Sequence, residues 1–249
     1  MPITNPFANI GFEDFCRWAR DPACSKYQRI GFPDEYRQGR EPAIFADIRG
    51  KLTLLDARGK QVLDVGPGSS DLPVLLIDHC AAHEHQLHLV DGAEMLAHLP
   101  DRAAVHKLAA QFPNCASFIR DHQQQFDVIL CYSVLHYAFV EVPFFRFIDS
   151  LLALLAAGGQ LLLGDIPNNS KRKRFFASAA GTRFHQQFMN TDAKPTVDFN
   201  CIEHDQLDDA VVVSLVQRAR AAGFDAYVVP QHPSLPMANR REDILIVRP

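Results

Sequence analysis

The sequence has few of the features that mark secreted, membrane or nucleic-acid-binding proteins. Its six cysteines are scattered with no C-x-x-C pair, so neither a disulfide framework nor a cysteine-based metal site is indicated. The longest uncharged run, residues 150–164, contains two glycines and is too short to span a bilayer. The net charge is −4, which offers no overall electrostatic attraction for nucleic acid. These absences favour a globular protein with free thiols and no nucleic-acid or membrane partner.

The first residues of the chain also lack a targeting pattern. Glu13 and Asp14 lie among aromatic side chains, and no basic start precedes a continuous apolar stretch. A signal peptide is therefore not expected, and we predict a cytoplasmic location. The length of 249 residues suits one substantial α/β domain with an added segment.

A glycine-rich stretch at residues 61–72 organises the rest of the sequence. An apolar strand pattern surrounds Asp64, Gly66 and Gly68 follow, and a Ser-Ser-Asp cluster can then cap a helix. Such a turn lets backbone approach a ligand closely and directs N–H groups toward it. A dinucleotide fingerprint would need a third glycine at position 71, but Asp71 there would repel a pyrophosphate. A cationic or zwitterionic ligand is favoured, although a tight turn without a ligand remains an alternative.

Two further features agree with a nucleoside-bearing ligand. Asp91 ends the second predicted strand, residues 86–90, where a carboxylate can accept from both ribose hydroxyls. Gly92 follows and leaves room for the ligand. The buried strand 126–131 then brings residues 132–137 to the same edge of the sheet. The three features together favour an adenosine-containing cofactor over an empty turn.

His136 is the side chain predicted to act as a general base, because an imidazole titrates near neutral pH. Its alternative role is to pack or cap at the start of a helix. Asp165 follows the strand over residues 160–163 and is a candidate substrate orienter or second base. Four histidines, His79, His83, His85 and His88, lie close together, but the helix is expected to end between His79 and His83. We therefore predict solvated histidines and no metal site.

The Asp64-x-Gly66-x-Gly68 loop, Asp91 and the Asp127-to-His136 segment together resemble class I S-adenosylmethionine-dependent methyltransferases. The resemblance implies an α/β fold with a Rossmann-like, doubly wound, seven-stranded sheet, mostly parallel with an antiparallel last strand. It implies S-adenosylmethionine as cofactor and methyl transfer by in-line displacement. The cofactor-binding residues that it suggests are Asp64, Gly66, Gly68, Ser69, Asp71, Asp91, Gly92, Gln111, Phe112, Tyr132 and Ser133.

The predicted organisation places an N-terminal helical cap at residues 1–57 before a cofactor-binding domain at residues 58–249. A lid insertion is expected at about 168–206, where residues 181–203 look polar and aperiodic. Tyr27 and Arg37 of the cap, with Lys171 and Arg174 of a basic run, are the predicted substrate-binding residues. Their alternatives are surface residues around a turn and a solvated helix face.

The segments around residues 26–37, 132–137 and 164–176 resemble bacterial methyltransferases of surface-glycan and nucleotide-sugar pathways. This resemblance implies a small-molecule acceptor, such as a sugar or nucleotide-linked sugar. Two alternatives stay open: an RNA or protein methyltransferase, and a non-catalytic subunit that binds the cofactor in a regulatory role. The cap helices are the surface on which a homodimer would first be expected.

Overall fold

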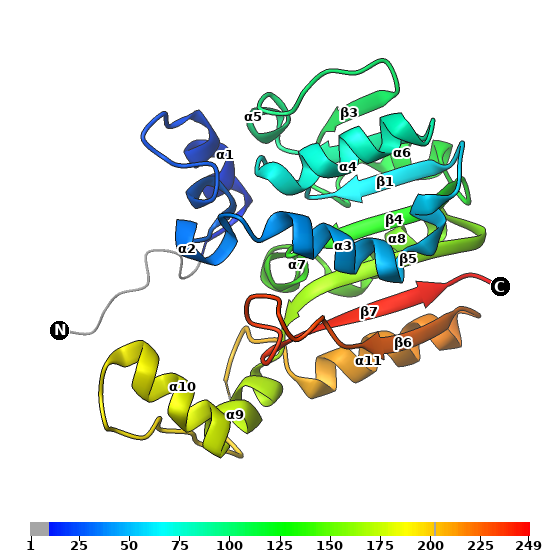
Figure 1. The fold of residues 1–249 in the computed structure, drawn as a ribbon. Coiled ribbons are helices and arrows are strands. Elements are labelled where there is room, and N and C mark those ends of the chain that lie inside the picture. The colour runs from blue at the N-terminus through cyan, green and yellow to red at the C-terminus, as the bar shows by residue number, and fades with distance from the viewer. Residues whose placement is uncertain (1–9, 202) are drawn as a thin grey trace.

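The computed structural model describes residues 10–201 and 203–249, which form helices packed around one seven-stranded sheet (Figure 1). The strand order is β3-β2-β1-β4-β5-β7-β6, and β7 runs antiparallel to both of its neighbours. The predicted fold, mostly parallel with an antiparallel last strand, is therefore confirmed. The strands are β1 (Gln61–Val65), β2 (Gln86–Asp91), β3 (Val105–Ala109), β4 (Phe126–Tyr132), β5 (Leu155–Pro167), β6 (Asp225–Val229) and β7 (Arg241–Val247).

The strands at the centre of the sheet are apolar on both faces because helices cover both. Along β4, Val128 and Leu130 join one core, while Ile129 and Cys131 join the other. α3 (Glu41–Lys51) and α4 (Asp71–Ala82) cover the first face, and they lie over the sheet in Figure 1. α7 (Leu135–Glu141), α8 (Phe144–Leu154) and α11 (Asp209–Ala221) cover the second. This burial explains the continuous hydrophobic run in the sequence of β4.

Two short helices complete the sheet domain beside β3, namely α5 (Ala93–Leu96) and α6 (Ala116–Asp121). α4 ends at Ala82, between His79 and His83, as predicted. His83 nevertheless stays on the last turn of the helix as its C-cap, because its backbone N–H donates to the carbonyl of His79 at 3.1 Å. The helix end therefore does not separate these two histidine side chains.

The segment before the sheet is helical. It contains α1 (Phe12–Arg20), η1 (Gln28–Ile30), α2 (Asp34–Arg37), α3 and η2 (Thr53–Asp56). α1 lies beside α5, and an ion pair between Arg20 and Glu94 joins them. Lys26 Nζ lies 2.5 Å from Asp71 Oδ2 at the start of α4. Residues 1–9 of the predicted cap lie outside the described residues.

The segment at 168–206 is more regular than the sequence suggests. Two consecutive helices, α9 (Asn169–Ala177) and α10 (Ala179–Met189), form its first part, and α10 covers residues 181–189 of the predicted aperiodic stretch. Ser178 accepts a hydrogen bond from the Gly181 N–H at 3.1 Å, so one residue ends α9 and caps α10. In Figure 1 these two helices project away from the sheet. None of the helices in the described ranges is long and apolar enough to cross a membrane.

Candidate active site

A cleft of about 900 Å³ opens at the carboxyl ends of β1, β2 and β4, beneath the helices that precede the sheet. It lies at the point where the strand order reverses between β1 and β4, the usual ligand position in such sheets. We call its side formed by Gly66, Pro67, Gly68, Ser70, Asp91, Met95, Ala110, Gln111 and Phe112 the glycine half. We call its side formed by Phe32, Arg37, Tyr132, Ser133 and Tyr137 the arginine half.

The glycine loop follows β1 and needs its two glycines for two different contacts. Gly66 and Gly68 have φ angles of +74° and +69°, in the left-handed region. A Cβ atom on Gly66 would lie 2.4 Å from Val134, and one on Gly68 would lie 2.7 Å from Ile30 of η1. The loop is therefore held between the segment after β4 and the N-terminal helices, and larger residues at these positions would displace one of them.

Asp91 ends β2 with its carboxylate held in place by backbone groups. Its Oδ2 accepts from the Gly68 N–H at 2.9 Å, and its Oδ1 accepts from the Gly92 N–H at 2.7 Å. Burial raises the pKa of Asp91 to about 6, although these two hydrogen bonds oppose the shift. The carboxylate thus joins the glycine loop to the start of α5 at the wall of the cleft.

Gln111 and Phe112 line the far end of the glycine half, after β3. The ring of Phe112 packs edge to face against Phe147, with centroids 5.2 Å apart. Met95 and Val142 complete this apolar end of the cleft. The arrangement provides an apolar wall against which a flat ring can pack.

Four of the residues predicted to bind the cofactor do not line the cleft, namely Asp64, Ser69, Asp71 and Gly92. Asp64 is buried, and burial together with the nearby Asp91 raises its pKa well above the usual range. Asp71 instead contacts Lys26 and accepts from the Tyr27 hydroxyl at 3.3 Å. These positions indicate support of the loop rather than contact with a ligand.

Glu41 is a part of the site that sequence reasoning missed. Its Oε2 accepts from the Asp71 N–H at 2.9 Å, so a buried carboxylate from α3 occupies the N-terminus of α4. Burial raises the pKa of Glu41. No sequence signal identifies this contact, because Glu41 lies 30 positions before its partner and looks like an ordinary first-turn acid.

Arg37 reaches the cleft from α2 and is buried there. Its Nη2 donates to Ser133 Oγ at 2.6 Å and to Asp165 Oδ2 at 3.0 Å, and the guanidinium carbon lies 4.3 Å from the Phe32 ring centroid. The Ser133 hydroxyl also donates to Asp165 Oδ2. Ser133 and Asp165 both have left-handed backbone, with φ of +61° and +58°. Non-glycine residues in this region store strain, which is frequent at functional sites.

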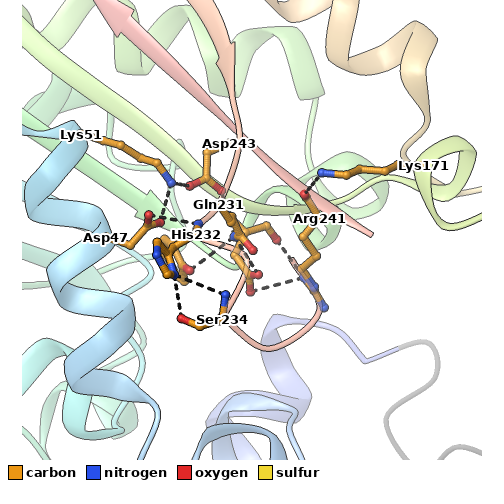
Figure 2. A network of polar contacts seen from close by, with 10 residues as sticks. Asp47, Lys51, Lys171, Gln231, His232, Ser234, Arg241 and Asp243 are labelled. Carbon is orange, nitrogen blue, oxygen red and sulfur yellow. Dashed lines mark hydrogen bonds and ion pairs between the residues drawn. The ribbon is translucent and has the colours of Figure 1, made fainter. Parts of the chain in front are cut away.

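Asp165 is the centre of a buried polar network that extends to α3 and β7. Arg241 Nη1 donates to the Asp165 carbonyl at 2.8 Å and lies 3.4 Å from its Oδ2. The Asp165 N–H donates to Asp243 Oδ1 at 2.8 Å, and Gln231 Nε2 lies within reach of both carboxylates. Figure 2 shows Lys51 of α3 reaching Asp243 at 2.7 Å. The network fixes the C-terminal end of β5, where Asp165 lies, from three directions.

The charges around Asp165 explain how a buried carboxylate stays ionised. Burial alone raises the pKa of Asp165, but the guanidinium groups of Arg241 and Arg37 outweigh it, and the hydrogen bonds from Ser133 and Gln231 add to their effect. The resulting pKa lies below the usual value. Asp165 is thus a permanent partner for two arginines and does not line the cleft, so its predicted role as a second base does not fit its position.

His136 requires a similar correction. It lies on the first turn of α7, it is not among the residues that line the cleft, and its ring packs against Tyr137 with centroids 3.8 Å apart. Burial, followed by the positive charges of Arg241 and Arg37, lowers the pKa of His136 to about 3. An imidazole with so low a pKa is a weak base. We therefore do not assign proton removal to His136.

The other predicted substrate-binding residues also lie away from the cleft. The Tyr27 ring is buried, and its hydroxyl contacts Asp71. Lys171 Nζ donates to the Arg241 carbonyl at 2.7 Å, and Arg174 pairs with Asp209 of α11. The basic run therefore ties α9 to β7 and α11. Of the four predicted residues, Arg37 lines the cleft.

Aromatic side chains from the first helices form a wall that sequence reasoning did not assign to the site. Phe12, Phe15 and Phe32 line the cleft, and Phe15 packs edge to face on Tyr137 with centroids 4.8 Å apart. The Phe12 N–H donates to Glu141 Oε1 at 2.8 Å, which joins α1 to the end of α7. The helical spacing of Phe12 and Phe15 predicts burial, but it does not distinguish a core from the wall of a cleft.

The fold and the cleft agree with comparisons to known proteins. The model of the methyltransferase domain family matches residues 35–227. A search among curated proteins finds no significant match. One similar solved structure is the plantazolicin methyltransferase BpumL with a monoazolic desmethylPZN analog and S-adenosylhomocysteine, at 11% identity and a TM-score of 0.57 over 86% of each chain.

Two further structures share the fold at similarly low identity. The CurJ carbon methyltransferase has a TM-score of 0.55 at 15% identity over 86% of this chain, which spans 56% of the length of that protein. The pyocyanin biosynthetic protein PhzM has a TM-score of 0.52 at 17% identity, over 96% of this chain and 62% of that one. None of these three structures gives support to the expected glycan pathway. The family match covers most of the chain, which therefore belongs to the methyltransferase domain family and is a class I S-adenosylmethionine-dependent methyltransferase.

Proposed function

We propose that this methyltransferase transfers its methyl group to a small, flat acceptor that binds as an anion beside Arg37. The observation that carries the proposal is the buried Arg37 guanidinium at the cleft wall, held by Ser133 and Asp165 and flanked by aromatic rings. The cofactor would occupy the glycine half and the acceptor the arginine half. The two halves line one continuous cleft, which suits two ligands that lie side by side.

The glycine half fits S-adenosylmethionine on the chemistry of its groups. The Asp91 carboxylate is oriented by two backbone N–H groups and can accept from ribose hydroxyls. The apolar wall formed by Phe112, which packs on Phe147, suits adenine, with the Gln111 amide available at its polar edge. The backbone of Gly66, Pro67 and Gly68 lines the cleft, and the methionine part would lie beside it. The cofactor supplies a methyl group on a sulfonium, ready for in-line displacement.

The arginine half favours an anion. Arg37 shares the carboxylate of Asp165 with Arg241, so its guanidinium has no carboxylate partner to itself. Arg37 uses one nitrogen, Nη2, for its hydrogen bonds to Ser133 and Asp165. Its other N–H groups can donate to an oxyanion or a carboxylate. The rings of Phe32, Phe15 and Tyr137 offer flat apolar contact beside this charge. A phenolate, an enolate or an aromatic carboxylate has the required chemistry.

This arrangement supplies a role for Arg37 in the reaction. No imidazole is found among the described residues that line the cleft, so proton removal by histidine has no support there. A cationic guanidinium lowers the pKa of a bound acidic hydroxyl, so the acceptor binds as its anion with its proton released to solvent. S-adenosylmethionine would supply the methyl group to that oxygen, with the C–O bond formed as the C–S bond breaks and S-adenosylhomocysteine as the leaving group. The protein aligns the two partners and excludes water.

A phosphorylated sugar acceptor and an RNA acceptor fit the cleft less well. Both need free cations for phosphate, whereas Lys171 lies 3.9 Å from Glu242 and Arg174 is paired with Asp209. The rings that line the arginine half also offer few hydrogen bonds to sugar hydroxyls. We therefore favour an aromatic anion over the sugar acceptor that the sequence suggests.

The test is a turnover assay that measures S-adenosylhomocysteine with panels of phenols, aromatic carboxylates, nitrogen heterocycles and nucleotide sugars. We expect turnover with acidic aromatic acceptors, and a loss of about 10²-fold or more in kcat/KM for Arg37→Gln, the effect of removing one charged contact at the reacting centre. Arg40→Gln is the matched control, because Arg40 is exposed on the same segment. Turnover confined to neutral sugars, or unchanged in Arg37→Gln, would contradict the proposal.

A further inference from the structure

A cluster of metal-ligating side chains lies outside the cleft, at the turn that leads into β1. Asp56, His79 and His83 each offer one potential ligand atom, and these three atoms lie within 4.8 Å of one another. Asp56 ends η2, whereas His79 and His83 occupy the last turn of α4 and its C-cap. Two histidines four positions apart on a helix, facing a carboxylate, form a donor set that suits zinc and similar divalent transition metals.

Hydrogen bonds from neighbouring groups orient the potential ligand side chains of the cluster, as such bonds commonly do in metal sites. The Nδ1 of His83 lies 2.9 Å from the carbonyl of His79, so this nitrogen carries the proton and Nε2 keeps a lone pair for a metal. The His79 and His83 rings stack with centroids 4.1 Å apart. Arg49 Nε holds Asp56 Oδ1 at 2.9 Å, which fixes the carboxylate without using both of its oxygens.

To bind a metal ion through Nε2, His79 must move the proton from this nitrogen to Nδ1. Its Nε2 lies 2.8 Å from the Leu55 carbonyl and 3.5 Å from Asp56 Oδ1. A neutral imidazole can carry its proton on either nitrogen, so a metal ion could take the place of the Nε2 proton between these groups. His85 cannot take part in the same way, because its Nδ1 accepts from the Lys60 N–H and its Nε2 therefore donates to the Leu55 carbonyl.

We propose that Asp56, His79 and His83 bind one divalent transition metal ion, with zinc as the reference ion. The ion would cross-link the turn before β1 to the C-terminal end of α4, and so stabilise the scaffold that holds the glycine loop. The three ligands do not line the cleft, which gives the ion a structural role and no part in methyl transfer. This inference does not depend on the identity of the acceptor.

The test is calorimetric titration of the chelator-treated full chain with Zn²⁺ alone, in the absence of cofactor. We expect one ion per chain and a dissociation constant weakened on the order of 10- to 100-fold by His83→Ala. The double variant His79→Ala/His83→Ala should lose the site and also lose any rise in melting temperature caused by Zn²⁺. His204→Ala is the control, because this exposed histidine lies in another part of the chain.

Two outcomes would overturn the metal site: wild-type protein that binds Zn²⁺ no more tightly than the double variant, or binding unchanged by His83→Ala. His83 is half-buried at a helix end, so this single variant keeps the test valid even if the loss of His79 impairs folding. Titration of the same variants with S-adenosylmethionine should show unchanged affinity, which separates a failure of the metal site from a failure of the proposed methyl transfer.

Discussion

The two halves of the cleft are built in different ways. The glycine half comes from the ends of three neighbouring strands, and backbone N–H groups of Gly68 and Gly92 orient its key carboxylate, Asp91. The arginine half is assembled from α2, the ends of β4 and β5 and the start of β7, and charged side chains far apart in the sequence hold it together. The first construction depends on backbone geometry and the second on a buried ion network.

This difference in construction determines how each half responds to amino-acid substitutions. Backbone groups do not depend on side-chain identity, so the glycine half tolerates change in its surroundings as long as the loop keeps its shape. In the arginine half, Arg37, Ser133 and Asp165 bind one another, and replacing one removes a polar partner from each of the other two. We expect variants of the glycine half to affect cofactor affinity and variants of the arginine half to affect folding and acceptor turnover.

The largest expected effect is on cofactor binding in Asp91→Ala. The substitution removes both ribose acceptors and also frees the N–H groups of Gly68 and Gly92. Hydrogen bonds to a charged group contribute about 1.5–3 kcal/mol each, so the loss of two weakens S-adenosylmethionine binding on the order of 10²-fold or more. Calorimetric titration measures the change. Asp78→Ala, an exposed acid on α4, should bind normally. If Asp91→Ala bound S-adenosylmethionine as tightly as the wild-type protein, the proposed position of the cofactor would be wrong.

The next effect concerns the ion network and compares a buried pair with an exposed one. Asp165→Ala leaves Arg37 and Arg241 buried without their carboxylate, which costs about 3–5 kcal/mol in the free energy of unfolding. Asp149→Ala removes an exposed ion pair with Arg218 and should cost only about 0–1 kcal/mol. Denaturant unfolding measures both. Similar losses in the two variants would show that the network does not stabilise the arginine half.

The glycine half can be predicted from the sequence more completely than the arginine half, for a physical reason. The strand, the glycine turn and Asp91 are local patterns whose spacing follows from the βαβ geometry, so the fold and the position of the glycine half could be read directly. The partners of Arg37 lie 96 and 128 positions away, and no local pattern links them. His136 misled the prediction because residue type indicates a base, whereas burial and two nearby arginines determine its pKa.

A third variant pair measures how strongly the N-terminal helices support the glycine loop. Gly68→Ala combines a left-handed backbone with a clash against Ile30, 2.7 Å from the added Cβ. Gly158→Ala has a similar φ of +72° with no atom within 4 Å, so it reports the backbone strain alone, about 1–2 kcal/mol. We expect Gly68→Ala to lose more stability and cofactor affinity than this control. Ile30→Ala in the same chain should restore part of the difference. Equal losses in the two glycine variants would mean that η1 does not constrain the loop.

The smallest effect is the acid sensitivity of two half-buried histidines, His88 on β2 and His136 beside the arginine half. Burial, with His106 and His122 nearby, lowers the pKa of His88 to about 4, and burial with Arg241 and Arg37 lowers that of His136 to about 3. Both stay neutral in the folded state at pH 5.5, whereas the unfolded chain takes up protons below its ordinary pKa of about 6.5.

The stability that each neutral histidine contributes is therefore present above pH 6.5 and is lost as the pH falls toward its folded pKa. Between pH 7 and pH 5.5 this amounts to about 1 kcal/mol for each residue. We expect His88→Gln and His136→Gln each to reduce the decrease in unfolding free energy between these two pH values, measured by urea denaturation. His204→Gln is the control and should leave the decrease unchanged, because this histidine is exposed. If only His136→Gln changes the decrease in unfolding free energy, the acid sensitivity belongs to the arginine half alone. The two halves then differ in their response to pH as well as in their construction.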